Sequence, residues 1–526
     1  FRQQIQNAAF DRLNMMAPRA ATDSVTIIDL DEASLDHIGQ WPWPRDIMAR
    51  LVRRLEAAGA KVIGLDMVFA EIDRTSPGQL AARIAPKIGT DIEKALRDLP
   101  SNDDVFAKSL RETGNVVTGF TAARSIRNTR SKPVIARPVY FPRMKTVHRR
   151  FIDNAYAPPG VATNLPLIAD NAAGNGAFII KPGIDGIVRE VPLLLSFPDP
   201  DLLKSGKAKK LAPAQLYPAL PLDVFRVSNG AKTPLYVRPK DEVGLFDKPY
   251  YLSTSMMGRG TRIPIASDGQ FRVYFRDVKG DEYLSAYKFL QDEVPDKLTQ
   301  EVRDKIVLVG TSAEGLRDIR STPLDVFVPG VEIHLNVIEQ ILQENYLYRP
   351  FFANKIEALV IFLTGLVLIV AAPFAGALVL LLLTVAVTVF LHMMSWYAFT
   401  QYHILLDPLY PSVAIIIIFL AANILAFIRT EAERKQVRDA FSLYISPAYM
   451  KELTQNPERL KLGGETRELT VMFTDIRKFS TISETMTPEE LIRTMNNFLT
   501  PMTDCVMEWR GTIDKYIGDA MMAFWN

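Results

Sequence analysis

The sequence has 526 residues, more than a single hydrophobic core usually supports, which predicts two or more domains. Hydrophobic residues make up 48% and charged residues 23%, a composition that excludes a disordered chain. The formal net charge of +2 gives no global argument for nucleic acid as a partner, and we expect none. The single cysteine, Cys505, excludes a disulfide framework, and five widely separated histidines argue against a histidine-based metal site.

The region from residue 24 to 73 has the pattern of a strand, a helix and a second strand. Val25–Leu30 is a short β-branched run, and Arg45–Ala58 has helical apolar spacing before Gly59, a residue type common after a helix end. Lys61–Asp66 is a second run typical of a buried strand. A right-handed parallel crossover is the default geometry for such a unit, so the pattern predicts an α/β fold.

Further elements extend this α/β domain over residues 1–350. The pattern predicts a helix at Val331–Leu342. Four more strands are predicted, at Asn115–Phe120, Gly186–Leu195, Phe271–Phe275 and Lys305–Gly310. The long intervals between these strands indicate a heavily inserted fold.

Acidic residues follow the two strands predicted between residues 24 and 73. Asp29, Asp31 and Glu32 stand at the end of the first strand, and Asp66 ends the second. Ligands of open α/β sheets bind beside the carboxyl ends of the strands, so these side chains are candidates for a ligand site. They fit helix caps as well, and the sequence leaves both interpretations open.

The segment Arg124–Arg150 holds nine basic residues and no acidic one. One interpretation is a surface for an anionic ligand, lipid headgroups or an acidic partner. The other is a solvated basic loop without a partner. Composition does not decide between them.

Three segments together resemble the CHASE2 family of extracellular sensor domains from bacterial transmembrane receptors. They are VTIIDLDEASLDHIGQWPWPRDIMARLVRRLEAAGAKVIGLDMVF, GIDGIVREVPLLL and KIVLVGTSAEGLRDIRSTPLDVFVPGVEIHLNVIEQIL. The resemblance covers residues 1 to about 345. It implies a sensor for an unidentified extracytoplasmic ligand or protein, and an output domain beyond the membrane, commonly reached through three spans.

Apolar residues are concentrated between residues 355 and 428. Residues 358–406 and 408–428 contain no charged side chain, and only Asp407 separates them. A helix needs about 20 apolar residues to cross a bilayer, and the run Ala372–Gly376 supplies a turn within the longer stretch. The pattern predicts transmembrane helices at about 356–372, 375–394 and 409–428. A buried helix of a soluble protein would not normally keep such runs free of charge.

The flanking residues predict the orientation of these spans. Arg429, Arg434, Lys435 and Arg438 follow the third span, whereas the loop 394–407 has no basic residue and is rich in aromatic ones. We therefore expect a protein of the plasma (inner) membrane. Its C-terminal part would lie in the cytoplasm, and residues 1–350 would lie on the periplasmic or extracellular side. Two basic residues before the first span, Arg349 and Lys355, mildly oppose this orientation. Export of residues 1–350 predicts a signal or anchor segment before Phe1.

Residues 429–453 read as a connector helix that continues the third span. Glu431 and Lys435 stand at i, i+4, and Val437, Phe441 and Tyr444 fall on one face. Such a helix could pair with its copy in a dimer and transmit a movement, or serve as a plain stalk. Pro447 is expected to end it.

Two carboxylates stand out in the last part of the chain, residues 460–526. Glu468–Thr474 is an apolar strand that ends in Asp475, and Ile476–Ser480 leads into a helix. Thr512–Trp525 reads as a hairpin that presents Asp519 in its Gly-Asp turn. Aspartates on neighbouring strand ends suit a two-metal site for phosphoryl transfer. Taken singly, Asp475 could cap a helix and Asp519 could be an ordinary turn residue.

The motifs LGGETRELTVMFTDIRKFSTISE and GTIDKYIGDAMMAFWN resemble the opening half of a class III nucleotide cyclase domain, an α+β fold of the ferredoxin-like type. The resemblance implies that Asp475 and Asp519 hold two Mg²⁺ or Mn²⁺ ions, with the Ile476 carbonyl as a further ligand. It implies that the backbone of Arg477, Lys478, Phe479 and Ser480 contacts the triphosphate of the substrate. The ions would activate the ribose 3′-hydroxyl for attack on the α-phosphorus, which yields a cyclic nucleotide and pyrophosphate.

In this family the position of Lys515 contacts the purine edge. A lysine there donates to N1 of adenine, whereas guanine carries a proton on N1, so the resemblance implies ATP as substrate. One departure is Lys478, where many relatives have glycine beside the phosphates. The alternatives are a guanylate cyclase, and a receptor or scaffold with a non-catalytic cyclase domain.

Class III cyclases build each active site from two domains. The motifs of the partner side would lie beyond Asn526, so we expect the chain to be active only as a homodimer that includes a further C-terminal part. The cyclase domain, the connector helix and the sensor domain are the expected dimer contacts. The function implied is that of a transmembrane receptor adenylate cyclase.

Overall fold

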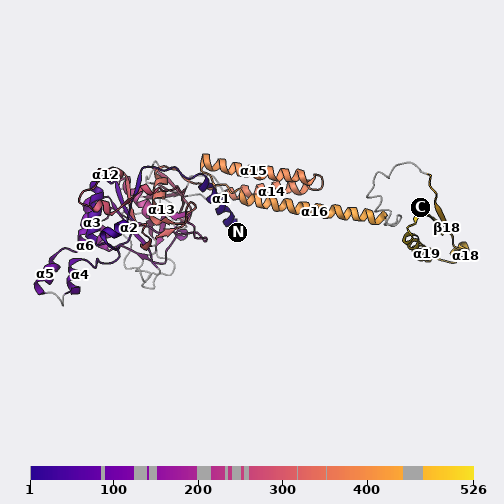
Figure 1. The fold of residues 1–526 in the computed structure, drawn as a ribbon, viewed down its shortest axis with the longest axis horizontal. Coiled ribbons are helices and arrows are strands. Elements are labelled where there is room, and N and C mark those ends of the chain that lie inside the picture. Colours follow the sequence, from indigo (N-terminus) through magenta and orange to yellow (C-terminus); the bar gives the residue numbers. More distant parts are fainter. Residues whose placement is uncertain are drawn as a thin grey trace. The chain divides into compact units, whose positions relative to one another are not determined.

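The computed structural model describes residues 2–84, 89–123, 139–140, 151–197, 215–230, 235–239, 250–253, 260–316, 318–350, 352–441 and 466–525. Figure 1 draws its helices and strands coloured along the sequence. By its internal contacts the chain divides into two compact units. The first comprises Phe1–Phe362 with Val385–Ala414, and the second comprises Leu363–Thr384 with Ile415–Asn526. Because 124–138 and 141–150 lie outside the described residues, the structure does not bear on most of the basic segment.

The first unit is built on a mainly parallel sheet of seven strands. In spatial order these are β14 (Tyr283–Ser285), β1 (Val25–Asp29), β15 (Ile306–Gly310), β2 (Val62–Leu65), β3 (Val116–Ala122) and β5 (Val161–Ala162), with β6 (Gly174–Ala177) also on β3. Only β5 runs antiparallel to its neighbour. The strands predicted near residues 25, 61, 115 and 305 are confirmed. β15, which comes from much later in the sequence, lies between β1 and β2. The predicted strand–helix–strand segment is therefore a crossover whose two strands are not neighbours in the sheet.

Helices cover both faces of this sheet. Ile28 and Val307 point to one face, where they pack with α3 (Arg45–Ala57) and α6 (Asn102–Thr113). Ile27 and Leu308 point to the other, where α10 (Leu220–Ser228) and α13 (Gly330–Leu342) lie. Burial on both faces explains why these strands read as continuous apolar runs rather than alternating ones. The helix predicted at Val331–Leu342 is α13.

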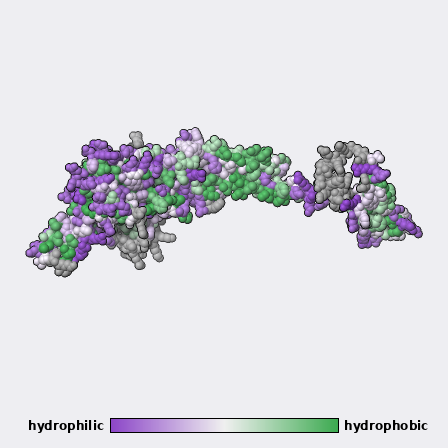
Figure 2. All heavy atoms as spheres, in the orientation of Figure 1, coloured by the Kyte–Doolittle hydropathy of each residue, from purple (hydrophilic) through white to green (hydrophobic). Residues whose placement is uncertain are grey.

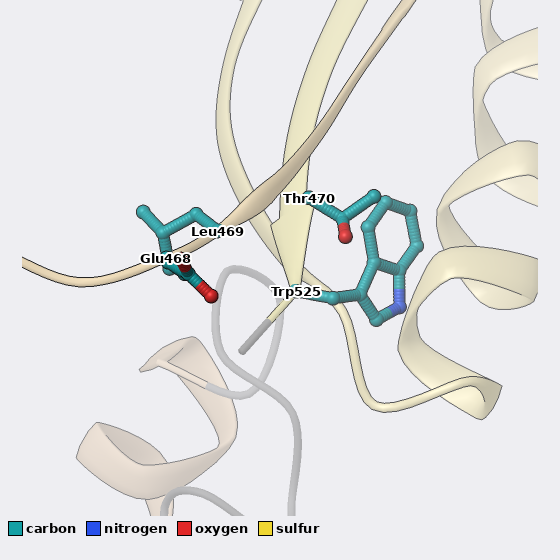
Figure 3. Close-up of a pocket in the computed structure, with 4 residues that line it drawn as sticks. All are labelled: Glu468, Leu469, Thr470 and Trp525. Carbon is teal, nitrogen blue, oxygen red and sulfur yellow. The ribbon is translucent and has the colours of Figure 1, made fainter.

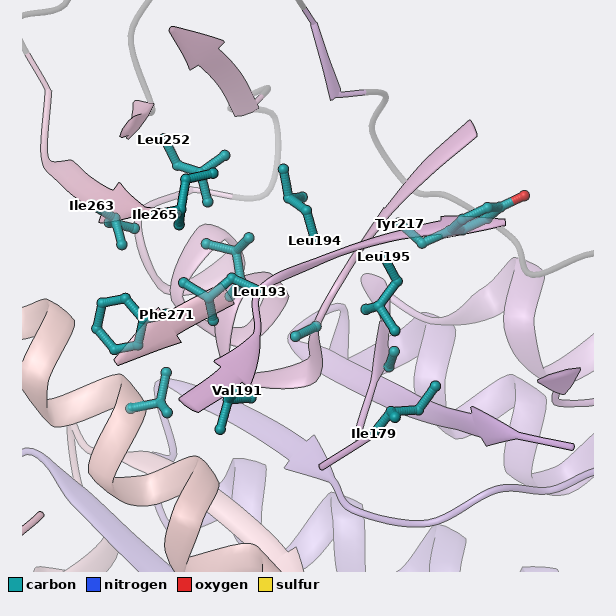
Figure 4. Close-up of a cluster of buried hydrophobic side chains, with 14 of the residues drawn as sticks. Ile179, Val191, Leu193, Leu194, Leu195, Tyr217, Leu252, Ile263, Ile265 and Phe271 are labelled. Carbon is teal, nitrogen blue, oxygen red and sulfur yellow. The ribbon is translucent and has the colours of Figure 1, made fainter. Parts of the chain in front are cut away.

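A second hydrophobic cluster packs on the other side of α13, around short antiparallel strands (Figure 4). The predicted strand Gly186–Leu195 is wrong in its extent. It forms two short strands, β7 (Glu190–Pro192) and β8 (Leu194–Phe197), which pair with different partners. Their partners are β13 (Gln270–Arg272), shorter than the predicted Phe271–Phe275, and β9 (Gln215–Pro218). Between them, the Leu193 amide donates to the Gly269 carbonyl at 3.0 Å and its carbonyl accepts from the Ala219 amide at 2.9 Å, so one apolar run serves two sheets.

The first unit contains further helices and strands, several of them short. The helices are α1 (Arg2–Met16), α2 (Glu32–Ile38), α4 (Pro77–Ile84), α5 (Thr90–Asp98), α8 (Pro166–Asn171), α11 (Tyr287–Leu290) and α12 (Asp296–Val302), with 3-10 turns η3 (Gly280–Glu282) and η4 (Glu314–Leu316). The strands are β4 (Val139–Tyr140), β10 (Leu235–Pro239), β11 (Tyr250–Ser253), β12 (Arg262–Ile265), β16 (Ile319–Arg320) and β17 (Val328–Pro329).

Among the residues that the structure describes, three helices are long and apolar enough to cross a membrane. They are α14 (Ala353–Ala371), α15 (Ala377–Tyr402) and α16 (Leu409–Phe441). Large apolar side chains on them are exposed, for example Phe362 at 64% and Leu425 at 67%, and Figure 2 shows a hydrophobic surface over these helices. Such a surface suits lipid rather than water.

The second helix ends later than predicted, whereas the third begins at Leu409 and continues into the charged connector as predicted. The predicted aromatic loop 394–407 is helical as far as Tyr402, because α15 contains neither glycine nor proline to end it earlier. The turn to the next helix is therefore shorter than predicted, and Asp407 orders it by accepting hydrogen bonds from the amides of Leu409 and Tyr410 at 3.0 and 3.2 Å. The charged connector is one helix with the third span up to Phe441, and Tyr444 and Pro447 lie outside the described residues.

The last part of the second unit is a small α+β fold. Its strands β18 (Thr470–Thr474), β20 (Ala520–Trp525) and β19 (Thr512–Ile517) form a sheet in that order. Its helices are α18 (Phe479–Ser483) and α19 (Pro488–Glu508). A capping box between Thr487 and Glu490 begins α19, and Val506 on this helix packs on the sheet.

Candidate active site

The β19–β20 hairpin presents Asp519 at its tip. Ile517 and Ala520 are the last paired residues, so Gly518 and Asp519 form a two-residue turn. Gly518 has φ +62, a left-handed conformation that is costly for most side chains and explains glycine at this position. The predicted hairpin is thereby confirmed.

Asp475 reaches the same end of the sheet from β18. Thr474, the residue before it, pairs with Met521, two residues after Asp519. The amide of Ile476 donates a hydrogen bond to Asp519 Oδ2 at 3.3 Å, which ties the turn after β18 to the hairpin tip. The sheet therefore brings together two aspartates that are far apart in sequence.

The turn after Asp475 is tightly wound. The Phe479 amide donates to the Ile476 carbonyl at 3.1 Å, and α18 starts directly afterwards. Lys478 has φ 61 and ψ 30, a left-handed conformation that glycine adopts at least cost. The departure from glycine at this position therefore keeps the glycine-like backbone and adds a side chain.

The residues at this edge suit a hard divalent cation. They offer carboxylate oxygens from Asp475 and Asp519 and the Ile476 carbonyl, the donor types that Mg²⁺ prefers. Within the described ranges no group of three His, Cys, Asp or Glu side chains could hold a metal ion. A site of two carboxylates is still compatible with Mg²⁺, which usually keeps waters and substrate phosphates as ligands.

Lys515 lies on β19, opposite Met522, and its ammonium group is 3.1 Å from Asp514 Oδ2. The Lys515 side chain is 59% exposed, so the pair is a weak surface contact. The sequence analysis did not single out Asp514, although the sequence shows an acidic residue directly before Lys515. The pairing of β19 with β20 shifts by one residue between Ile513 and Lys515, so Asp514 lies at an irregularity of the strand.

A pocket in the same unit lies at the opposite end of β18. It is lined by Glu468, Leu469, Thr470 and Trp525, and Thr470 pairs with Trp525 at the far end of the two strands (Figure 3). None of the predicted catalytic residues lines it. We therefore place the candidate active site at the aspartate end of the sheet and not in this pocket.

In the first unit, the acidic residues after β1 and β2 bind groups of the chain itself. Asp31 caps α2 by accepting from the Ser34 amide at 2.8 Å. Asp29 accepts from the amide of Ser312 at 2.9 Å and from its hydroxyl, and burial raises the pKa of Asp29 to about 6. For these two aspartates the capping and structural interpretation holds.

Asp66 differs because it is buried beside His334 of α13. Burial raises the pKa of the Asp66 carboxyl well above its usual range, and its Oδ1 lies 3.8 Å from His334 Nε2. Burial lowers the pKa of His334 to about 3, so the imidazole is neutral at pH 7. Neither ring nitrogen of His334 has a hydrogen-bond partner among the residues that the structure describes.

Two protein families match the chain. Residues 1–370 match the family described as CHASE2 domain, and residues 464–526 match the adenylate and guanylate cyclase catalytic domain. An adenylate cyclase of Anabaena cylindrica is 36% identical over 94 residues, 18% of this chain and 19% of that protein. Adenylate cyclase 1 of Rhizobium meliloti (strain 1021) is 37% identical over 98 residues, 17% of this chain and 14% of that protein.

The chain covers less than a fifth of the length of these curated relatives. The CHASE2 match, by contrast, takes in most of the chain, including all the strands of the seven-stranded sheet. The cyclase match takes in the sheet that carries both aspartates. The protein therefore belongs to the CHASE2 family, and three candidate transmembrane helices connect its CHASE2 domain to part of a class III cyclase catalytic domain.

Proposed function

We propose that the protein is a transmembrane receptor adenylate cyclase that converts ATP to 3′,5′-cyclic AMP and pyrophosphate under control of its CHASE2 domain. One observation carries this proposal: the Ile476 amide bonds to Asp519, which joins the two aspartates at one end of the β18–β20 pair. The named relatives, both adenylate cyclases, support the same activity.

Each residue of the site has a proposed role. Asp475, Asp519 and the Ile476 carbonyl hold the cations, and the backbone from Arg477 to Ser480 holds the triphosphate. Two Mg²⁺ or Mn²⁺ ions, when bound, would lower the pKa of the ribose 3′-hydroxyl and neutralise the leaving pyrophosphate. The compact turn supports the backbone role, because the left-handed Lys478 bends the chain sharply before α18.

Lys515 is proposed to select adenine. Its ammonium would leave the exposed Asp514 carboxylate and donate to N1 of the base. An exposed ion pair contributes about 0–1 kcal/mol, so this exchange costs little. Asp514 would then keep the Lys515 side chain extended from β19 in the absence of nucleotide.

The proposed organisation places residues 1–350 outside the plasma (inner) membrane as the sensor. Residues 355–428 cross it three times, 429–453 form the connector helix, and 460–526 belong to the cytoplasmic cyclase domain. We propose that the protein works as a homodimer through its cyclase domains, connector helices and sensor domains. The exposed apolar side chains of β18, Val471 at 45% and Phe473 at 66%, support a further covering surface for this sheet.

Membranes that contain the full-length protein would test the activity. With Mn²⁺ and ATP we expect cyclic AMP, and Asp475→Ala should reduce its rate about a hundredfold or more, because it removes a ligand of ions that contribute several kcal/mol to the transition state. Asp504→Ala, an exposed carboxylate on α19, is the matched control and should keep the rate.

The same assay separates the alternatives. Cyclic GMP from GTP, without cyclic AMP from ATP, would identify a guanylate cyclase and refute the role of Lys515. Neither product, from protein that is folded and dimeric, would leave a non-catalytic receptor or scaffold. An equal rate in Asp475→Ala would remove the aspartate from the site.

A further inference from the structure

The CHASE2 domain contains a polar cleft of about 440 Å³, lined in part by the start of the GIDGIVREVPLLL segment. One of its walls is α1, from which Gln3, Gln4 and Asn7 line the cleft. The turn from Lys181 to Glu190 forms another part of the lining, and residues from 268 to 272 complete it. A volume of this size falls within the range of small-molecule sites.

Two arginines in the lining are neutralised by the chain itself. Arg189 donates from Nε and Nη2 to the carboxylate of Asp11 at 2.8 and 2.7 Å, and from Nη1 to Asp185 at 3.0 Å. Arg272 donates to Glu190 at 2.5 Å. These ion pairs order the walls. Within the lining the two arginines balance Asp185 and Glu190, and the additional carboxylate, Asp11, lies outside it.

Two other charged groups in the lining are available. The Lys181 ammonium lies 5.2 Å from the ring centre of Tyr156 and has no carboxylate partner within the described part of the chain. Asp268 uses one oxygen to accept from the Gln270 amide at 3.1 Å, which leaves its second oxygen for a ligand. The cleft therefore offers one cation and one anion, with side-chain amides from α1 around them.

The turn that carries Lys181 is held in one conformation. The Gly183 amide donates to the Ile187 carbonyl at 2.9 Å, and the Gly186 amide donates to the Gly183 carbonyl at 3.0 Å. Gly186 has φ +83, and Asp185 is fixed by Arg189. A wall that is ordered before binding loses little conformational entropy when a ligand arrives.

We propose that this cleft binds a small zwitterion, a free amino acid or a very short peptide, whose carboxylate meets Lys181 and whose ammonium meets Asp268. The amides of Gln3, Gln4 and Asn7 would then hydrogen-bond the polar groups between the two charges. A purely anionic ligand would face Asp268, and a purely cationic one would face Lys181. The unpaired charges of the lining thus favour a ligand that carries both signs.

The helix that forms one wall also contacts the membrane helices. Arg2 of α1 donates to Glu357 of α14 at 3.3 Å, and Glu357 accepts from the amide of Asp407, in the turn before α16, at 3.0 Å. Phe10 of α1 shares a buried cluster with Phe399 of α15. A ligand that shifts α1 would therefore act on the ends of all three helices; this consequence rests on the proposed function, whereas the binding does not.

Binding is tested on the full chain in detergent micelles by isothermal titration calorimetry. The probes are the individual L-amino acids and a set of dipeptides, compared with their N-acetylated amides, with acetate and with inorganic phosphate. We expect at least one zwitterion to bind saturably and its acetylated amide to fail. Whether the amino acid or the dipeptide binds more tightly identifies the source of the zwitterion.

Lys181→Gln and Asp268→Asn should each weaken that binding about tenfold or more, since each removes one charge-assisted contact. Both substitutions keep a polar side chain, and the asparagine keeps the acceptor for Gln270. Lys297→Gln, on the exposed face of α12, is the matched control and should bind as the unaltered chain does.

Three results would overturn the proposal: no zwitterion binds, the acetylated amide binds equally well, or acetate or phosphate alone binds with the same affinity. Cyclic AMP production by the full-length protein is measured in parallel. Binding without any cyclic AMP would refute the proposed enzyme and leave the cleft assignment intact. Cyclic AMP without zwitterion binding would refute the cleft alone.

Discussion

The sheet of the CHASE2 domain and the sheet of the cyclase part have strands of similar apolar character but are covered differently. Ile27 and Ile28 of β1 are both fully buried, because helices pack on each face of their sheet. Val471 and Phe473 of β18 are 45% and 66% exposed. An apolar strand sequence thus predicts that the strand should be buried, whereas the surrounding elements decide whether it is buried. In the cyclase part, the match to only part of a catalytic domain accords with the exposed strand.

The largest expected effect concerns a buried ion network that has no counterpart in the described cyclase residues. Glu339 of α13 is fully buried and accepts from Arg19 at 2.9 Å and from Arg276 at 2.6 Å. Glu339→Ala would leave two buried guanidinium groups without this carboxylate, which should destabilise the domain by about 3–5 kcal/mol. Hydrogen exchange at the amides of β15 would measure this loss.

Glu112→Ala serves as the control, because the ion pairs of Glu112 with Arg53 and Lys108 are exposed, and it should change stability by less than about 0.5 kcal/mol. Equal effects of the two substitutions would show that the Glu339 network does not stabilise the domain.

A pair of core substitutions tests the difference in cover directly. Leu308→Ala in β15 should cost about 2–5 kcal/mol, since Leu308 is fully buried between the sheet and its helices. Phe473→Ala should cost less than about 0.5 kcal/mol in this chain, because most of the Phe473 side chain is already exposed. Hydrogen exchange of β15 and of β18 measures each separately. A large cost at Phe473 would show that a partner or another segment covers β18.

A further prediction is a pH dependence of the CHASE2 domain. Burial lowers the pKa of His334 to about 3, against about 6.5 in an unfolded chain, with the nearby Arg320 adding to the shift. Between these values the unfolded chain binds more protons, so stability falls as the pH decreases from 6.5. The raised pKa values of Asp29 and Asp66 act in the opposite direction, so only a comparison with a variant isolates the histidine.

His334→Leu should therefore lose less stability than the unaltered chain between pH 6.5 and 4. Thermal unfolding at several pH values would measure both proteins. At pH 7.5 the variant should be close to the unaltered chain, because neutral His334 makes no hydrogen bond within the described residues. Parallel pH profiles of the two proteins would contradict the buried, neutral histidine.

Local patterns were sufficient for much of the fold. The runs around residues 25, 61, 115 and 305, the helix at 331–342 and the hairpin at 512–525 all follow from short-range periodicity and turn residues. The end of α15 was predicted too early, because aromatic residues suggested an interface loop while nothing in the segment breaks a helix. The Gly186–Leu195 run was predicted as one strand, because periodicity does not reveal that β7 and β8 pair with different partners.

The sequence by itself determined the order of the parts, the apolar helices and the residue types of the candidate active site, because these depend on composition and on neighbouring residues. The tertiary structure decided which distant segments meet. It inserted β15 between β1 and β2, joined Ile476 to Asp519, and formed the polar cleft between α1 and the turn at Lys181. Strand order and cleft walls depend on long-range packing, and local propensity carries no record of which of several compatible apolar strands will be neighbours.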